Sequence, residues 1–428
     1  MGELPAHWKT LAIKHVARLN PSKSCISIEK MKGMCSFIPM EKLKFNSLSL
    51  DEIKGVSDVY NGYTYFENED ILIAKVTPCF ENKNMVVAHE LNNGIGFGSS
   101  EIYVLRCNDI INNYFLFYRL QEDNFMSIAE GTMTGAGGLK RVPSEILNNF
   151  KFGLPSKKEQ SIIVNFLKHE TAKIDNLIEK QQQLIELLKE KCQAVISNVV
   201  NVRSNERKTK LKNLVNMQTG YPFPSAKFKF SSDNSIALLR GVNVGVDSIK
   251  WDDVVYWDVS ALDRLNEYLL VAGDIVFGMD RPWISSGTRV SEIKEQDLPC
   301  LLLQRVARIR SNIKSYQPFI KLCLSSNEFR EYAEIDLTGV SVPHISPEQI
   351  SNFYVKDIPF DQQVNLTKNA LKKIEKIKII QEMSEQTIQI LQERRAALIS
   401  AAVIGKIDVR DWVAPAKQEN EEPQEATA

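Results

Sequence analysis

The chain has 428 residues, of which 43% are hydrophobic and 25% charged, and its 53 lysines and arginines balance 53 acidic residues. This length predicts two or three domains, and the composition is that of an ordinary globular protein rather than a disordered or fibrous one. A net charge of zero counts against a nucleic-acid-binding protein, which is usually basic, but it leaves room for one that gathers its basic residues on one face.

Neither a targeting segment nor a metal cluster is expected. The N-terminal sequence MGELPAHWKT has no apolar targeting core, and no apolar run is long enough to cross a bilayer, so we expect a cytoplasmic protein without membrane contact. The seven cysteines are scattered without a CxxC pair, and only five histidines accompany them. This pattern does not supply the clustered ligands of a zinc or iron–sulfur site, and it favours reduced thiols.

Residues 1–155 predict a first globular domain of mixed α and β structure in which strands predominate. Residues 59–66 contain an Asn-Gly pair that is typical of a hairpin turn, and residues 114–126 favour a single helix. The apolar runs typical of buried strands are residues 70–76, 85–88 and 102–105.

Two glycine clusters in this domain invite comparison with phosphate-binding loops. They are residues 94–98 and 135–138, and neither completes GxGxxG, because Ser99 and Lys140 stand where the last glycine belongs. We interpret these residues as turn glycines.

Residues 156–203 predict one long helix, and its sequence recurs near the end of the chain. Glu159 aligns with Gln362, and this offset of 203 positions (362 − 159) then holds without a gap as far as Val200 and Val403. Both copies carry a seam of residues in alternating steps of three and four, which predicts that the two helices pack on each other as a strut. The alternative is two amphipathic helices packed on separate cores.

The expected seam consists of equivalent positions in the two copies. In the first copy it is Val164, Leu167, Thr171, Ile174, Ile178, Gln181, Ile185, Leu188, Cys192, Val195 and Val199. In the second copy it is Thr367, Ala370, Ile374, Ile377, Gln381, Ser384, Ile388, Leu391, Arg395, Leu398 and Ala402.

Residues 204–359 predict a second domain that repeats the first. Residues 273–278 align with 69–74 at an offset of 204 positions, and at the same offset Pro347 aligns with Pro143 and Thr338-Gly339 with Thr134-Gly135. The segments between these anchors differ widely. We therefore infer one scaffold with two divergent surfaces.

The remaining segments connect or end these units. Residues 360–405 predict the second long helix, with Gly405 at its end, and residues 406–428 predict a C-terminal extension that is mostly disordered, from Pro415 onwards. The basic segment 201–212 predicts a linker, and a phosphate contact is the alternative interpretation.

The sequence resembles the specificity subunit of type I restriction-modification systems. The likeness covers nearly the whole chain and rests on the order and duplication of short motifs. These are Leu4-Pro5 and Trp8, the strand Asp70-Ile71-Leu72-Ile73 and its copy, Thr-Gly followed by Pro-x-x-Ile, Leu-Pro with Glu-Gln before the first helix, and the ending Leu398 to Asp408. The second copy departs from the pattern with Gln362-Gln363, and the first helix ends without a glycine like Gly405.

The resemblance implies an α+β protein with two similar target-recognition domains, each followed by a long helix, and with the two helices pairing as an antiparallel coiled-coil spacer. Each domain would read one half of a split, asymmetric sequence in double-stranded DNA. The helices would set the spacing and seat the methyltransferase subunits, two of them, which bring S-adenosylmethionine. Restriction and translocation subunits would use ATP and magnesium, and this chain would hold no cofactor.

The residues themselves agree that the chain lacks catalytic machinery of its own. They contain no Walker loop and no Asn-Pro-Pro-Tyr/Phe motif of the kind that adenine methyltransferases carry. No pair of residues sets a general acid against a base. The alternatives are a structural coiled-coil adaptor that does not bind DNA and an enzyme of unfamiliar type.

Candidate DNA-contacting residues are polar or basic residues in loops that follow strands or lie beside glycine turns, because such loops vary without loss of the fold. In the first domain they are Lys75, Thr77, Lys83, Lys140 and Arg141. In the second domain they are Arg240, Asn243, Arg281, Trp283, Arg289 and His344. The segments 75–78 and 279–282 are favoured among these, since they follow equivalent strands.

Overall fold

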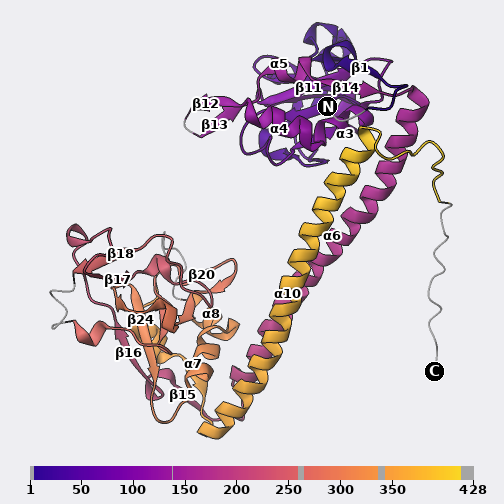
Figure 1. Cartoon of the computed structure of the whole chain (residues 1–428). Coiled ribbons are helices and arrows are strands. Elements are labelled where there is room, and N and C mark those ends of the chain that lie inside the picture. The colour runs from indigo at the N-terminus through magenta and orange to yellow at the C-terminus, as the bar shows by residue number, and fades with distance from the viewer. Residues whose placement is uncertain (1–3, 137, 259–264, 336–342, 416–428) are drawn as a thin grey trace, which may run out of the picture. The chain divides into compact units, whose positions relative to one another are not determined.

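The computed structural model describes residues 4–136, 138–258, 265–335 and 343–415. The chain divides into two compact units, Met1–Gln181 with Gln386–Ala428, and Gln182–Glu385. Each unit contains one domain rich in strands and a part of both long helices, which are α6 (Lys157–Val200) and α10 (Phe360–Val403) (Figure 1). The expected α+β class is confirmed.

The first domain is built on two four-stranded sheets. One has the order β2 (Ala17–Leu19), β11 (Ile102–Cys107), β8 (Ile71–Ala74) and β9 (Met85–Val87). The other has the order β6 (Ile53–Gly55), β3 (Met34–Ile38), β10 (Ile95–Gly98) and β7 (Thr64–Glu67). The smaller pairs are β1 (Lys9–Ala12) with β14 (Lys151–Leu154), β4 (Leu43–Lys44) with β5 (Ser47–Leu48), and β12 (Thr134–Ala136) with β13 (Leu139–Arg141). The helices are α1 (Ile28–Met31), α2 (Val56–Val59), α3 (Asn113–Gln121), α4 (Asp123–Gly131) and α5 (Ser144–Asn149).

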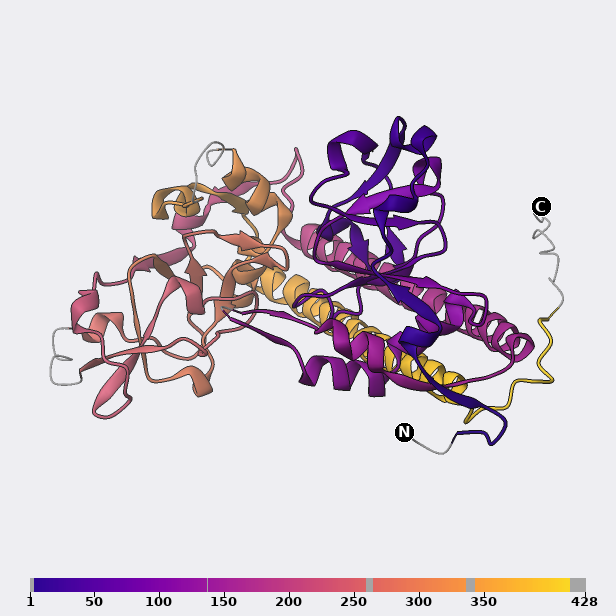
Figure 2. The ribbon, with the colours of Figure 1, turned by 90° about the horizontal axis from the view of Figure 1, so that it is seen from above.

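The core of the first unit joins the first sheet to both long helices. Ile71, Ile73 and Leu105 from the sheet are fully buried in one cluster with Leu167 of α6 and Ile399 of α10. The domain therefore packs directly on the beginning of α6 and the end of α10 (Figure 2).

The second domain repeats this plan with a different periphery. One sheet has the order β16 (Val215–Thr219), β24 (Val306–Ser311), β19 (Ile275–Gly278) and β22 (Val290–Glu292). The other has the order β18 (Val255–Asp258), β17 (Ser235–Leu239) and β23 (Cys300–Leu302). The pairs are β15 (Lys208–Lys210) with β25 (Tyr354–Lys356), and β20 (Trp283–Ile284) with β21 (Gly287–Thr288), and the helices are α7 (Gln317–Leu324), α8 (Asn327–Glu334) and α9 (Pro347–Asn352).

The strand register confirms the offset of 204 positions in the central sheets. Ala74 lies opposite Ile102 in the first domain, and Gly278 lies opposite Val306 in the second. Beyond the sheets the offset changes, so the alignment of Pro347 with Pro143 is wrong by one residue. The amide of Val142 donates to the carbonyl of Lys75, and the amide of Ile345 donates to that of Met279, which makes 203 the offset at this point. Thr338-Gly339 lies outside the described residues.

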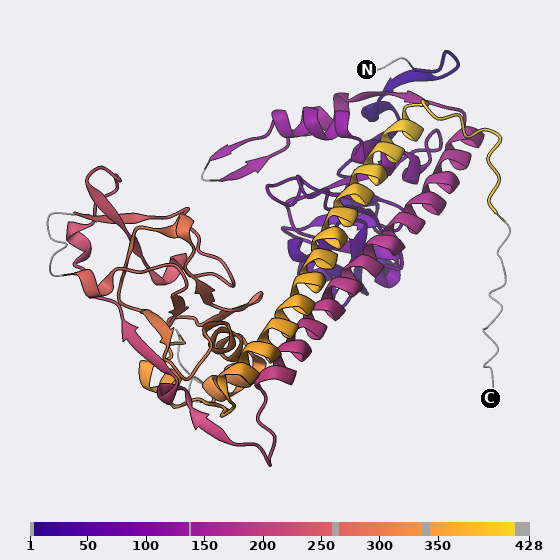
Figure 3. The ribbon, with the colours of Figure 1, turned by 60° about the horizontal axis from the view of Figure 1, so that its bottom comes forward.

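The two long helices pack on each other in opposite directions, as expected. In the first unit the beginning of α6 contacts the end of α10, where Asp175 accepts hydrogen bonds from Arg395 at 2.8 and 3.4 Å. In the second unit the end of α6 shares a core with the beginning of α10, through Ile196, Ala370 and Ile374. Every predicted seam residue is buried or half-buried. Figures 1 and 3 show the two ribbons side by side, and the alternative of separate cores without contact is excluded.

Each long helix has a buried glutamine in its first turn, Gln160 in α6 and Gln363 in α10. The side chain of Gln160 accepts from the amide of Asn112 at 2.7 Å and donates to the carbonyls of Ile110 and Pro155. Gln363 does the same in the second unit, with the amide of Tyr316 and two carbonyls. This residue joins each helix to its domain.

Replacing Gln160 with Ala is therefore expected to lower the free energy of unfolding by about 2 kcal/mol, because a buried amide and two carbonyls lose their partner. Gln363→Ala should have a similar effect, and Lys158→Ala, at an exposed position two residues before Gln160, should have none. Denaturant unfolding of the purified chain measures all three. Equal stability of Gln160→Ala and Lys158→Ala would contradict the anchoring role.

Three local predictions in the first domain are wrong. The residues before the Asn61-Gly62 pair form helix α2 rather than the first strand of a hairpin. Residues 114–126 are divided into α3 and α4, because Glu122 is extended with φ −68° and ψ 149°. Gly96 and Gly98 lie in strand β10 rather than in a turn, and a Cβ on Gly96 would stand 2.3 Å from the Phe66 ring.

The end of α10 packs against the N-terminal segment. Gly405 has φ +76° and ends the helix as predicted, and a Cβ there would collide with Pro5. The extension before Pro415, where disorder was predicted to begin, packs on this end of the protein: Val409 is buried, and the Trp412 ring contacts Phe166. Residues 416–428 lie outside the described part of the chain. Among the residues described, no helix is long and apolar enough to span a membrane.

Candidate nucleic-acid interface

Each domain has a site where the central strand, β8 or β19, ends beside the segment that precedes α5 or α9. In the first domain the amide of Lys75 donates to the carbonyl of Glu101 at 3.0 Å, and the amide of Thr77 donates to that of Lys140. In the second domain the amide of Met279 donates to the carbonyl of Arg305, and the amide of Arg281 donates to that of Pro343. We call these two places the strand-end sites.

This shared hydrogen-bond frame identifies the equivalent residues of the two sites. The pairs are Lys75 with Met279, Val76 with Asp280, Thr77 with Arg281, Glu101 with Arg305, and Arg141 with His344. Four of these five pairs exchange a charged side chain for an uncharged or oppositely charged one, and the fifth pairs Arg with His. The two sites thus share one backbone arrangement but carry side chains of different chemistry.

In the first strand-end site a carboxylate holds two cations. Arg141 donates two hydrogen bonds to Glu101, at 3.0 and 2.6 Å, and Lys75 Nζ lies 4.0 Å from the same carboxylate. These hydrogen bonds raise the pKa of Arg141 and lower the pKa of Glu101. Both groups therefore stay charged over the whole physiological range.

Thr77 and Lys140 complete this site. The Thr77 hydroxyl donates to the carbonyl of Gly138 at 2.9 Å and accepts from the amide of Lys140 at 3.0 Å, which fixes the β12–β13 hairpin to the strand end. Lys140 is exposed, and among the described residues its ammonium group has no ion-pair partner. Four of the five first-domain candidates are thus brought together.

In the second strand-end site the carboxylate comes from a different position of the frame. Arg305 stands where the first site has Glu101, and Asp280 stands where it has Val76. Asp280 Oδ1 lies 2.6 Å from Nδ1 of His344 and 3.4 Å from Nη1 of Arg305. Because a carboxylate only accepts, the imidazole proton must lie on Nδ1 in this arrangement. Arg281 is exposed beside this cluster.

Arg289 lies beneath this site and ties it to a neighbouring loop. Its guanidinium donates to the carbonyls of Val244 at 2.9 Å and Asp280 at 2.8 Å, and also to that of Gly241. Burial lowers the pKa of Arg289. This residue braces the site through backbone contacts.

The other four candidates have structural partners outside the strand-end sites. Lys83 donates to the carbonyl of Gln121 at 2.9 Å, at the end of α3. Asn243 is only 1% exposed and bonds to the backbone of its own loop, while Arg240 pairs with Asp253 at 2.8 Å. Trp283 packs on the core of the domain. DNA contact by these residues stays a prediction.

The sequence analysis missed Glu101, Asp280 and Arg305. Glu101 and Arg305 immediately precede the strands β11 and β24, far along the chain from the loops that follow β8 and β19. The offset of 204 positions pairs a Glu with an Arg at this point, and such a charge reversal at a matched position was the available signal.

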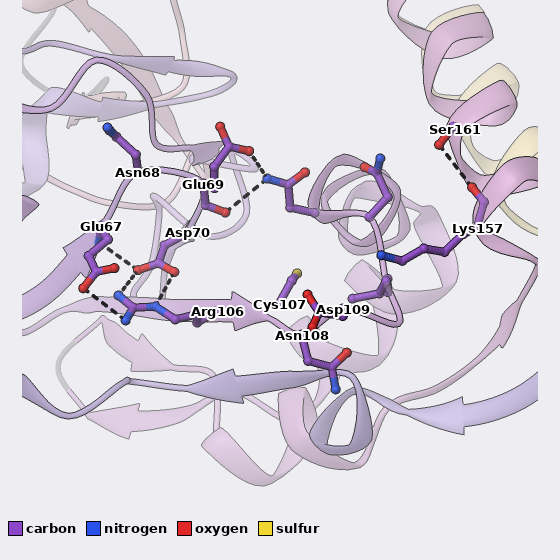
Figure 4. A pocket seen from close by; sticks show the side chains of 13 residues that line it. Glu67, Asn68, Glu69, Asp70, Arg106, Cys107, Asn108, Asp109, Lys157 and Ser161 are labelled. Atoms are coloured by element: carbon purple, nitrogen blue, oxygen red, sulfur yellow. Dashed lines mark hydrogen bonds and ion pairs between the residues drawn. The ribbon is translucent and has the colours of Figure 1, made fainter. Parts of the chain in front are cut away.

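The first domain also has a polar cavity of about 400 Å³ beside the beginning of α6. Figure 4 shows Glu67, Asp70 and Arg106 at one end of it and Lys157 and Ser161 at the other. Arg106 donates to both oxygens of Asp70, at 2.8 and 2.7 Å, and these bonds raise the pKa of Arg106. Arg310 and Asp274 form the matching pair in the second domain.

The lining of this cavity is more acidic than basic, so it does not suit a phosphate. Burial raises the pKa of the Cys107 thiol, which also lines the cavity, to about 12, so this sulfur is a poor nucleophile at neutral pH. Among the described residues, no group of three or more His, Cys, Asp or Glu side chains is placed to hold a metal ion. The cavity is part of the scaffold of the strand pair β8 and β11.

Two sibling domains with one backbone frame and exchanged charges, joined through an antiparallel pair of long helices, define a duplicated recognition protein. Residues 5–187 match the family model described as the type I restriction modification DNA specificity domain. Over this part the chain is similar to the specificity subunits of type I restriction-modification systems, and its curated relatives bear that name.

Three relatives of known class show the extent of this likeness. The EcoAI specificity subunit of Escherichia coli is 28% identical over 90% of this chain and 81% of its own length. The EcoEI specificity subunit of the same organism is 32% identical over 44% of this chain and 32% of its own length. The MjaVIII specificity subunit of Methanocaldococcus jannaschii is 26% identical over 71% of this chain and 72% of its own.

Solved structures have the same fold. A chain from a study of complex assembly and conformational transition of the type I R-M system matches 95% of this chain and 100% of its own length, with a TM-score of 0.75 and 13% identity. The HsdS subunit from Thermoanaerobacter tengcongensis matches 95% and 98%, with a TM-score of 0.52 and 15% identity. All three curated relatives are named specificity subunits, and none of these names supports the adaptor alternative.

Proposed function

We propose that each domain reads one half of a split, asymmetric sequence in double-stranded DNA through its strand-end site. The observation that carries this proposal is the identical hydrogen-bond frame of the two sites, which presents Lys140 and Arg141 in one domain and Arg281, Arg305 and His344 in the other. Different donors and acceptors on one frame select different base edges. Two unlike half-sites follow.

The antiparallel helices would set the number of unread base pairs between the half-sites. Each helix has 44 residues, which corresponds to about 66 Å at about 1.5 Å per residue. A continuous helix resists changes in length, so it is suited to act as a ruler.

The outer faces of the same helices would seat the methyltransferase subunits, two of them, which bring S-adenosylmethionine. In the second unit, large apolar side chains on these helices are exposed instead of buried in the seam. They are Leu184 and Leu187 of α6 and Leu371, Ile379, Ile380 and Met383 of α10. Clustered exposed apolar residues favour association with another protein.

Restriction and translocation subunits would join this assembly and use ATP and magnesium, with no cofactor held by this chain. Because the proposed target is cellular DNA, the protein would work in the cytoplasm, without membrane contact.

Exchange of one domain tests this proposal. Residues 9–150 are replaced by the matching domain of another specificity subunit, the chain is expressed with its methyltransferase subunits, and methylated adenines are mapped. The expected result is a new sequence in one half-site, with the other half-site and the gap unchanged. Exchange of residues 208–356 is the control and should change only the other half. A change in both halves after either exchange would contradict the proposal.

A further inference from the structure

Two arginines of the second strand-end site have backbone conformations that side chains rarely adopt. Arg281 has φ +45° and Arg305 has φ +73°. The equivalent residues of the first domain, Thr77 and Glu101, do not have positive φ. Non-glycine residues in this region are uncommon, and they concentrate at functional sites where the surrounding structure enforces them.

Both residues take part in the backbone frame of the second strand-end site. The amide of Arg281 donates to the carbonyl of Pro343 at 2.7 Å, and the carbonyl of Arg305 accepts from the amide of Met279 at 3.0 Å. Both side chains are exposed, that of Arg305 to 57%. The second site therefore presents two exposed guanidinium groups at one strand end, on a backbone conformation that the first site lacks.

The guanidinium groups keep donors for a ligand. The Arg305 guanidinium forms one weak ion pair, because its nitrogen lies 3.4 Å from the Asp280 carboxylate. His344 lies nearer to the same carboxylate, at 2.6 Å. Among the described residues the Arg281 side chain has no hydrogen-bond partner. In the first domain, by contrast, two nitrogens of the Arg141 guanidinium already donate to Glu101.

We propose that Arg281 and Arg305 read guanine in the half-site of the second domain, by donating paired hydrogen bonds to N7 and O6 in the major groove. This inference rests on the proposed function. Arg is the residue that most often makes this contact, because its planar fork matches the two acceptors. Asp280 and His344, which contact the Arg305 guanidinium, are positioning residues.

A phosphate contact would use the same donors, but the structure favours the base. A phosphate contact carries no sequence information and needs no fixed orientation, whereas reading a base edge does. Both arginines are fixed at the backbone, and Arg305 is braced by Asp280. These constraints favour a reading role.

The test uses the complex of the full chain with its methyltransferase subunits and DNA carrying the mapped target. Each guanine in the half-site of the second domain, assigned by domain exchange, is replaced in turn by 7-deazaguanine, which lacks the N7 acceptor. We expect a loss of affinity of about tenfold or more at one or two positions. Arg281→Ala and Arg305→Ala should each abolish the effect at one of these positions, and Arg330→Ala, on α8 of the same domain, is the matched control.

The outcomes separate the inference from the proposed function. A half-site without guanine, or 7-deazaguanine that never changes the affinity, would overturn the inference while the function stands. Arginine variants that bind all sequences equally less well would show phosphate contacts and would also overturn it. A methylation map without any split sequence that depends on this chain would instead refute the proposed function itself.

Discussion

Adding one heptad to each long helix, after Gln181 in α6 and after Ser384 in α10, is expected to lengthen the gap between the recognised half-sites by about three base pairs. Seven residues add about 10.5 Å of helix, and about three base pairs of duplex have the same length. A heptad in both helices keeps the alternating steps of the seam, so the antiparallel packing survives. Mapping methylated adenines in cells that carry the lengthened chain gives the new gap.

The matched control adds four residues instead of seven at the same two places. Four residues rotate the seam out of register, so helix pairing and methylation should both decline instead of shifting to a new target. A lengthened chain that still methylates the original target, with the gap unaltered, would show that the helices do not set the distance.

Replacing Asp70 with Ala is expected to destabilise the first domain by about 3 kcal/mol, because Arg106 and the amide of Glu67 lose a partner that is only 2% exposed. Breaking such a pair costs more than the pair contributes, since one charge stays partly buried without compensation. Hydrogen exchange measures the effect locally: amides of β8 and β11 should exchange about 100-fold faster.

Two variants serve as comparisons for Asp70→Ala. Asp109→Ala removes an exposed carboxylate from the same cavity and should leave the exchange of β8 and β11 unchanged. Asp274→Ala removes the equivalent partner of Arg310 and should speed exchange in β19 and β24 only. Unchanged exchange in Asp70→Ala itself would mean that the pair does not stabilise the strands.

The sequence alone predicted the long helices and the duplication, because both depend on local periodicity. The seam alternates in steps of three and four over eleven positions in each copy, and every one of these positions is buried or half-buried. The central strands around Ile71 and Ile275 were also predictable, since their apolar runs match at a constant offset.

The composition of the strand-end sites could be predicted only in part. Lys75, Thr77 and Arg281 follow the central strand directly and were found for that reason. Glu101 and Arg305 enter the sites through pairing between strands that are distant in the sequence, and the order of residues alone does not reveal this pairing. The equivalence of Arg141 with His344 needs the backbone hydrogen bonds, because the prolines alone give an alignment that is wrong by one residue.

The local errors have physical causes of the same kind. Asn61-Gly62 is a good hairpin turn by composition, but the preceding residues form a helical turn that buries Val56 and Val59 in the core of the second sheet. Residues 114–126 have helical composition throughout. Glu122 nevertheless breaks the helix. Its side chain is buried next to Arg119, a contact that depends on tertiary packing and not on local composition.

The measurement that tests the central claim most directly is a genome-wide map of methylated adenines in the host, with and without the gene for this chain. We predict one split, asymmetric sequence that is methylated when the gene is present and unmethylated when it is deleted. Identical maps in the two strains would contradict a DNA-recognition role for this protein.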